Sequence, residues 1–133
     1  MENSLQSLIQ IGFEEAGHWF LSNGGIGFIL HKHKQASDCL YAFTSEDRIL
    51  YIGKTTKTLF QRMMGYSHPG PSQKTNIRNH QLIKETFQRG KNVDIFAFVP
   101  EETMSYRGFQ VNIAAGLEDN LIAYFKPPWN ILK

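Results

Sequence analysis

The alternation of apolar and polar positions along the chain predicts two β-hairpins. In the first, His18–Leu21 and Ile26–Leu30 flank Asn23-Gly24-Gly25. This sequence favours a hairpin turn because these residues tolerate a positive φ. The second hairpin organises the rest of the chain. Its apolar runs, Leu40–Phe43 and Ile49–Ile52, are separated by five mostly polar residues.

The register of the second hairpin follows from where its turn is centred. A turn centred on Glu46 places Tyr41 opposite Tyr51. Directly opposed residues of an antiparallel pair point to the same face of a sheet. On this register we expect both phenols to lie on one face, close to the helix that follows Gly53.

The helical period and the capping signals predict four helices. The first is capped by Asn3 or Ser4 and ends near Gly12, and the second spans Thr56–Tyr66. The third spans Asn76–Gln88, with a cap at Thr75 and an end at Gly90, and the fourth spans Leu117–Phe125. The apolar arc of the second helix comprises Leu59, Phe60, Met63 and Met64. Arg62 and Tyr66 lie at the edge of that arc, where the core anchors a residue that still reaches solvent. In the third helix, the buried side is predicted to carry Ile77, Ile83 and Phe87.

Glu118 is misplaced on the fourth helix, because it falls inside the apolar arc that contains Leu117 and Leu121. A carboxylate on a core-facing side is costly unless it is paired or bound to a metal. We therefore interpret Glu118 as a candidate metal ligand. The alternative is a structural ion pair, for instance with Arg62.

These elements predict a single domain, residues 1–133, of the α+β class. Asn92–Val99 supplies a third strand and Pro100 ends it, and Glu101–Ala115 is loop-like with a small strand near Tyr106-Arg107 and Phe109–Val111. The predicted core, residues 39–133, is a central three-stranded antiparallel sheet flanked by helices. Residues 1–38 form an extension of an N-terminal helix and a β-hairpin.

Composition narrows the class of function. The single cysteine, Cys39, and the absence of a signal-like N-terminus or a long apolar run predict a cytoplasmic protein without a membrane partner. The net charge is only +2, but residues 54–91 contain eight basic residues and one acidic residue, so this segment is +7 and the remainder −5. Such a segment is consistent with a polyanion-binding surface, and equally with a solvated helix surface.

The polar residues that packing does not explain suit phosphodiester hydrolysis. A carboxylate such as Glu118 suits Mg²⁺, and the guanidinium of Arg62 presents paired donors to a phosphate. Tyrosine is a poor base unless nearby cations lower its pKa, and Lys54, Arg62 and a metal could do so. Taken singly, the tyrosines could be a cross-strand aromatic pair and Arg62 a surface arginine.

An ordered set of residues runs through the chain: Tyr41, the intact Tyr51-Ile52-Gly53, Arg62 eleven residues after Tyr51, Glu118 opening a late helix and Asn130 after a proline. This set resembles the GIY-YIG nuclease superfamily. The first triplet, Cys39-Leu40-Tyr41, keeps only its tyrosine. Tyr66 stands where many members have histidine. This tyrosine and the Lys74-Thr75-Asn76 entry to the next helix are similar to the type II restriction endonuclease branch.

The resemblance implies a DNA endonuclease of restriction or repair type, with one Mg²⁺ or Mn²⁺ per active site and double-stranded DNA as its partner. Among the tyrosines, Tyr41 would be the general base or orient water, Tyr51 would position water or phosphate, and Tyr66 would contact phosphate or share the proton relay. Arg62 would bind the scissile phosphate, and Glu118 would hold the metal. DNA contacts would come from Lys54, Lys57, His68, Lys74, Asn76, Arg78 and Asn130, of which Asn130 would also support the site. Cleavage of both strands would require a homodimer or two successive events. The alternative is a non-catalytic nucleic-acid-binding module on the same scaffold.

Overall fold

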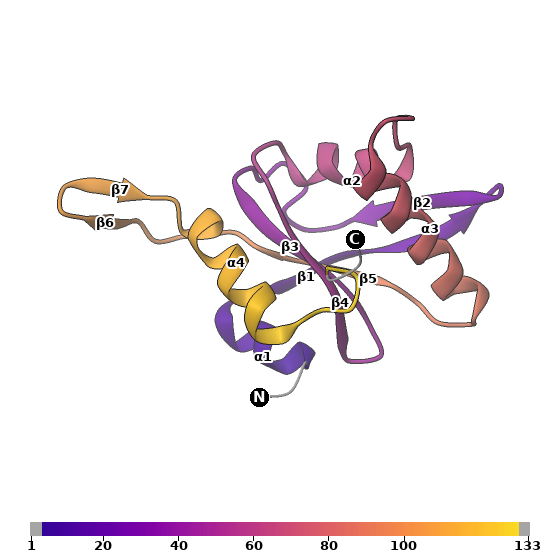
Figure 1. The fold of residues 1–133 in the computed structure, drawn as a ribbon, viewed down its shortest axis with the longest axis horizontal. Helices are drawn as coiled ribbons and strands as arrows, with labels where there is room; N and C mark the ends of the chain where they lie inside the picture. Colours follow the sequence, from indigo (N-terminus) through magenta and orange to yellow (C-terminus); the bar gives the residue numbers. More distant parts are fainter. Residues whose placement is uncertain (1–3, 131–133) are drawn as a thin grey trace.

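The computed structural model describes residues 4–130, and within them the chain forms an α+β fold (Figure 1). The elements in chain order are α1 (Leu5–Ile11), β1 (Glu14–Ser22), β2 (Gly25–Leu30), β3 (Cys39–Ser45), β4 (Arg48–Thr55), α2 (Leu59–Ser67), α3 (Lys74–Gln88), β5 (Asp94–Phe98), β6 (Met104–Tyr106), β7 (Phe109–Val111) and α4 (Ile113–Phe125). No helix among these residues is long and apolar enough to span a membrane.

The central sheet is larger than the predicted three strands. Within residues 4–130 it has five strands in the order β2-β1-β5-β3-β4, and each neighbouring pair is antiparallel. The N-terminal hairpin, β1 and β2, is therefore part of the main sheet and not a separate extension. Its strand β1 pairs with β5, from far along the sequence. This long-range pairing leaves no local sequence signal, which is why the prediction missed it.

The register of the second hairpin also differs from the prediction. Tyr51 lies opposite Phe43, and Tyr41 lies opposite Gly53. The turn is centred between Glu46 and Asp47, since Ser45 pairs with Arg48, and a β-bulge between Phe43 and Thr44 shifts the pairing by a further residue. The turn residues Glu46 and Asp47 both have positive φ, 49° and 68°. Tyr41 and Tyr51 still share one face of the sheet, but as diagonal neighbours whose ring centroids are 6.3 Å apart.

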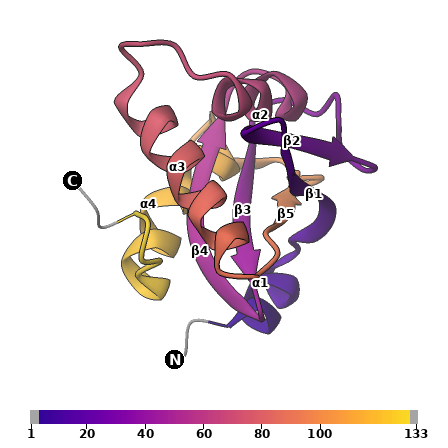
Figure 2. The same ribbon diagram turned by 90° about the vertical axis from the view of Figure 1, so that its right-hand side faces the viewer.

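Each face of the sheet has its own apolar core. On one face, Tyr41, Phe43 and Trp19 pack with residues of α2 and α3, including Met63 and Ile83. On the other face, a cluster from α1, β3, β4, β5, α4 and the turn after α1 comprises Leu8, Phe13, Leu40, Ala42, Ile49, Ile52, Phe96, Ala114, Leu121 and Phe125. Figure 2 shows α2 and α3 side by side, and these two helices are in contact.

The helix boundaries refine several predictions. Ser4 caps α1 by accepting from the amide of Ser7, whereas Asn3, the other predicted cap, lies outside the described residues. Helix α2 begins three residues later than Thr56, with Thr58 and Gln61 forming a capping box. Helix α3 begins at Lys74, ahead of the predicted cap at Thr75, and α4 begins at Ile113 behind an Asn112 cap.

Two predicted helix faces were confirmed in part, because Ile83 of α3 and Leu59 and Met63 of α2 are buried, but each face includes one exposed residue. Ile77 was predicted to be buried in α3 but is 41% exposed, and the buried positions of that helix are Asn76, Asn79, Ile83 and Thr86. In α2, Met64 is 38% exposed and Tyr66 is fully buried. The core-facing side of α2 is therefore rotated towards Tyr66 relative to the prediction.

Candidate active site

The polar centre of the structure is a cluster of two phenols and one guanidinium between β3 and α2. The hydroxyls of Tyr41 and Tyr66 are 2.6 Å apart and share a hydrogen bond. Arg62 donates from Nε to the Tyr41 hydroxyl at 3.1 Å and from Nη2 to the Tyr66 hydroxyl at 2.8 Å. Both phenols thus lie beneath the guanidinium, which also stacks over the Tyr66 ring at 4.2 Å.

Gly53 makes room for this cluster. A Cβ at this position would lie 2.5 Å from the Tyr41 hydroxyl oxygen and 2.6 Å from Cζ of the same ring. The Tyr41 ring therefore occupies the space above Gly53 that a side chain would fill. The glycine is required here by close approach across the β3–β4 pair.

Asn76 holds the remaining side of the guanidinium. Arg62 donates from Nη1 to Oδ1 of Asn76 at 3.0 Å. An arginine has five N–H donors, and the contacts to Tyr41, Tyr66 and Asn76 use three of them within the described part of the chain. One N–H on each Nη is left, which is the donor set that binds two oxygens of a phosphate.

Burial sets the protonation of the two phenols. Tyr41 is 1% exposed and Tyr66 is fully buried. Burial raises the pKa of Tyr41 well above the ordinary value for tyrosine, although Arg62 opposes this shift. Burial likewise raises the pKa of Tyr66, and the nearby Tyr41 adds to the shift. Arg62 does lower the pKa of Tyr41, as expected, but desolvation outweighs the charge of Arg62.

Tyr51 completes the aromatic side of the cluster. Its ring centroid is 6.3 Å from that of Tyr41 and 6.4 Å from that of Tyr66. It also stacks on Phe43 at 5.7 Å. Tyr51 is only half-buried, so it is the tyrosine of the three through which solvent or a ligand meets this cluster.

Glu118 lies on the opposite face of β4 from the phenols. Residues alternate sides along a strand, so Lys54 and Ile52 face α4 while Tyr51 and Gly53 face α2. The Glu118 carboxylate is 3.8 Å from Nζ of Lys54, and its side chain is 19% exposed. The ion pair foreseen for Glu118 therefore exists, but with Lys54 and not with Arg62. Burial raises the pKa of Glu118, while Lys54 lowers it.

Glu118 could hold a divalent cation only at a site with few protein ligands. No group of three or more His, Cys, Asp or Glu side chains that could hold a metal occurs in residues 4–130. Mg²⁺ usually keeps several waters and binds through one or two carboxylates plus phosphate oxygens. The partly buried carboxylate of Glu118, with an exposed lysine as its ion-pair partner, is compatible with that mode.

The C-terminal segment covers the edge of β4 at Leu50 and Ile52. The amide of Asn130 accepts from the backbone N–H of Ile52 at 2.8 Å and donates to the Ile52 carbonyl at 2.8 Å. Trp129 donates its backbone N–H to the Leu50 carbonyl. Asn130 was predicted to contact DNA and to support the site. Its side-chain amide is hydrogen-bonded to β4, the strand that carries Tyr51 and Lys54.

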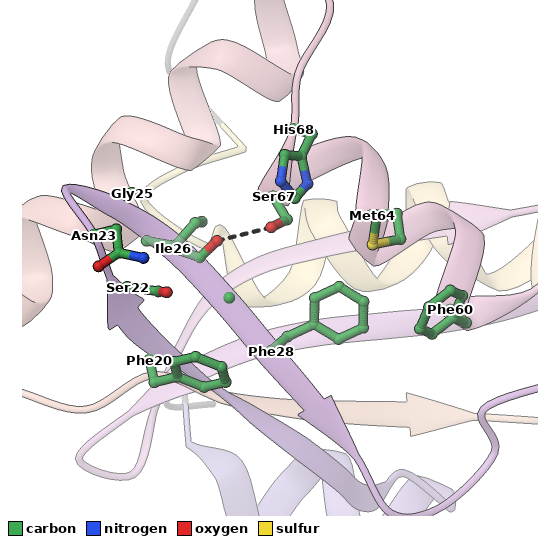
Figure 3. A pocket seen from close by; sticks show the side chains of 11 residues that line it. Phe20, Ser22, Asn23, Gly25, Ile26, Phe28, Phe60, Met64, Ser67 and His68 are labelled. Carbon is green, nitrogen blue, oxygen red and sulfur yellow. Dashed lines mark hydrogen bonds between the residues drawn. The ribbon is translucent and has the colours of Figure 1, made fainter.

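The other predicted DNA-contacting residues lie outside the Arg62 cluster. Lys57 and Lys74 are exposed, and Arg78 is half-buried with a buried Nε that has no partner in the described chain. His68 lines a groove of about 530 Å³ between α2 and the β1–β2 hairpin (Figure 3), whose walls include Phe20, Phe28, Phe60 and Met64. Ser67 borders the same groove and donates to the Ile26 carbonyl at 2.7 Å.

Sequence reasoning missed two residues beside the cluster. Gln73 accepts from the Asn76 amide at 3.1 Å, and His80 contacts the Tyr66 carbonyl through Nδ1 at 2.9 Å. Both could have been found from spacing, because Gln73, Asn76 and His80 recur at the three- and four-residue intervals that share one side of a helix.

This arrangement places the chain in a fold class that includes DNA endonucleases of known structure. Over 98% of this chain and all of the other, it superposes on the bacteriophage T4 EndoII E118A mutant, with a TM-score of 0.76 and 22% sequence identity. Restriction endonuclease Hpy188I, solved in complex with product DNA, matches 99% of this chain and 87% of its own, with a TM-score of 0.58 and 16% identity. No protein-family model and no curated protein sequence matches the chain. At these identities the similarity establishes the fold.

Proposed function

We propose that this protein is a metal-dependent DNA endonuclease of the GIY-YIG superfamily, which hydrolyses phosphodiester bonds in double-stranded DNA. The observation that carries the proposal is the Arg62 guanidinium, fixed by Tyr41, Tyr66 and Asn76 with donors left over. The fold shared with T4 EndoII and Hpy188I supports it. The Hpy188I likeness favours a restriction-type role over a repair-type role.

In this mechanism Arg62 holds the non-bridging oxygens of the scissile phosphate. A pentacovalent phosphorus carries extra negative charge, and a preorganised guanidinium stabilises it without moving. Tyr41 and Tyr66 stay neutral because burial raises their pKa, so they do not cancel the charge of Arg62. Their proposed role is to orient the guanidinium, and Tyr41 would also act as the general base or orient the attacking water.

Tyr51, Lys54 and Glu118 supply the rest of the site around the edge strand β4. Half-buried Tyr51 positions water or phosphate, and exposed Lys54 contacts the DNA backbone beside the reacting group. Glu118 would hold the Mg²⁺ or Mn²⁺ ion, one per site, which when bound neutralises charge on the phosphate oxygens as a Lewis acid. Lys54, whose Nζ is 3.8 Å from the Glu118 carboxylate, would lie beside that metal site.

DNA beyond the scissile phosphate would be bound by the basic segment, through Lys57, Lys74 and Arg78. One chain provides one such site and cuts one strand. A homodimer, or two successive events, is therefore needed for a double-strand break.

Nicking of supercoiled plasmid tests the proposal. We expect the pure protein to nick plasmid with Mg²⁺ and not with EDTA. Arg62→Lys keeps the charge but loses the planar fork, and should lower the rate on the order of 10²-fold. Arg48→Lys makes the same change at an exposed position and should cleave normally. Binding without nicking would indicate the non-catalytic module, and neither binding nor nicking would refute a nucleic-acid function.

A further inference from the structure

Three hydrogen bonds connect the loop between α2 and α3 to the guanidinium of Arg62. The backbone N–H of Gly70 donates to Oε1 of Gln73 at 2.8 Å, and Nδ2 of Asn76 donates to the same Oε1 at 3.1 Å. Oδ1 of Asn76 then accepts from Arg62 Nη1 at 3.0 Å. We propose that Gln73 and Asn76 are positioning residues that link the conformation of this loop to the orientation of Arg62. The inference rests on the proposed function, since Arg62 is the phosphate ligand there.

The chemistry of the link allows only one arrangement of its groups. Arg62 can only donate, so Asn76 must turn Oδ1 towards it. That orientation points Nδ2 away from Arg62, where Oε1 of Gln73 accepts it. Asn76 is 7% exposed, so few waters can reach its amide, although Gln73 itself is exposed. A displacement of Gln73 therefore leaves the Asn76 amide without its acceptor.

Gln73 is used for this link and not for its helix. It occupies the N-cap position of α3, but its side chain makes no capping hydrogen bond. Side chains at N-caps usually accept from the first amides of the helix. Here Oε1 of Gln73 instead accepts one hydrogen bond from the loop and one from Asn76.

Gly65 shows how closely the link is packed. A Cβ at Gly65 would lie 3.3 Å from Nη1 of Arg62 and 3.3 Å from Nδ2 of Asn76. A side chain at this position would press on the contact between Arg62 and Asn76. The absence of one leaves that contact undisturbed.

Through these hydrogen bonds, the conformation of the loop can affect the orientation of Arg62. His68, Pro71 and Ser72 are exposed in the loop, on the basic segment that we propose binds DNA. A DNA contact that orders Gly70 would favour the Gln73 acceptor position, and with it the Arg62 orientation. Coupling of this kind is reciprocal, so phosphate bound at Arg62 would also order the loop.

Gln73 offers a discriminating pair of variants. Both of its bonds are accepted by one oxygen, so Gln73→Glu keeps them while Gln73→Ala removes them. We expect Gln73→Ala to lower the single-turnover cleavage rate roughly 10- to 100-fold, with a change in the Kd for DNA in EDTA below about twofold. Gln73→Glu should restore the rate to within about threefold of the native value. Gln81→Ala, at an exposed site on the same helix, should match the native protein.

A second measurement tests the hydrogen bonds between Gln73, Asn76 and Arg62 in the protein without DNA. The Arg62 Nε–H resonance in a ¹H–¹⁵N NMR spectrum reports its bond to the Tyr41 hydroxyl. We expect this resonance to shift in Gln73→Ala and Asn76→Asp and to stay in place in Gln73→Glu and Gln81→Ala. This readout needs no cleavage, so a native protein that fails to nick DNA would refute the proposed function while the resonance still decides the link.

Direct DNA contact by Gln73 predicts different results. In that case Gln73→Ala would weaken DNA binding, and Gln73→Glu would weaken it further because the carboxylate repels phosphate. That pattern would overturn the positioning role. So would a Gln73→Ala variant with the native rate and an unmoved Arg62 resonance.

Discussion

Gly53→Ala is the sharpest test of the packing beneath Arg62. The new Cβ would lie 2.5 Å from the Tyr41 hydroxyl oxygen, whereas heavy atoms normally keep about 3.5 Å. The ring must therefore move by about 1 Å. It cannot retreat freely, because its hydroxyl is 2.6 Å from that of Tyr66. Overpacking of this kind costs about 1–3 kcal/mol of unfolding free energy.

Alanine is otherwise compatible with this position, so the sign of the effect is informative. Gly53 does not have a positive φ, and glycine is intrinsically poor in strands, so without the clash the substitution would stabilise β4. We expect instead a fall in Tm of roughly 3–12 °C. Because Arg62 is positioned through the displaced phenol, nicking should slow on the order of 10²-fold.

Thermal denaturation and plasmid nicking on the same preparation measure both effects. Gly116→Ala is the matched control, since a Cβ there meets nothing within 4 Å on the surface of α4. It should stabilise the protein by about 0.5–1 kcal/mol, as alanine does in helices. A Gly53→Ala protein with native Tm and native cleavage would refute the placement of Tyr41 over this glycine.

Three further predictions concern single groups. Tyr41→Phe leaves Arg62 Nε without its acceptor and should lower the nicking rate on the order of 10²-fold, and an unchanged rate would count against the positioning role. Burial raises the pKa of Glu118, so its ionisation costs stability as pH rises through that pKa. Glu118→Gln should therefore raise Tm at pH 8 and not below about pH 4 in a pH series, and a lower Tm at pH 8 would contradict this. DNA affinity should fall steeply with salt in a binding titration if residues 54–91 contact phosphates, whereas a salt-insensitive complex would exclude that surface.

Local sequence signals predicted the elements of this fold better than their assembly. The Asn23–Gly25 turn and the Ser4 and Gly12 boundaries were confirmed, because turn and cap chemistry is local. The pairing of β1 with β5 was missed since it joins distant segments. The Tyr41–Tyr51 register was wrong because the turn is centred between Glu46 and Asp47 and because the bulge after Phe43 has no distinctive sequence.

The site was predictable in its members but not in their burial. Tyr41, Arg62 and Tyr66 do meet, as the pattern of the second hairpin and its following helix indicated. A helical wheel placed Tyr66 at a solvent edge, yet Tyr66 is fully buried, with its hydroxyl against that of Tyr41 and its ring against Phe43. Burial raises the pKa of Tyr41 against the opposing charge of Arg62, and no pattern in the sequence carries that information.

The measurement that most directly tests the central claim is Mg²⁺-dependent nicking by the Glu118→Ala protein. Glu118 and Arg62 lie on opposite faces of the sheet. They can therefore contact the same phosphate only if that phosphate lies at the edge of β4. We expect Glu118→Ala to bind DNA in EDTA as the native protein does and to show no nicking with Mg²⁺. Native-like nicking by this variant would contradict the metal assignment and the two-faced site built on it.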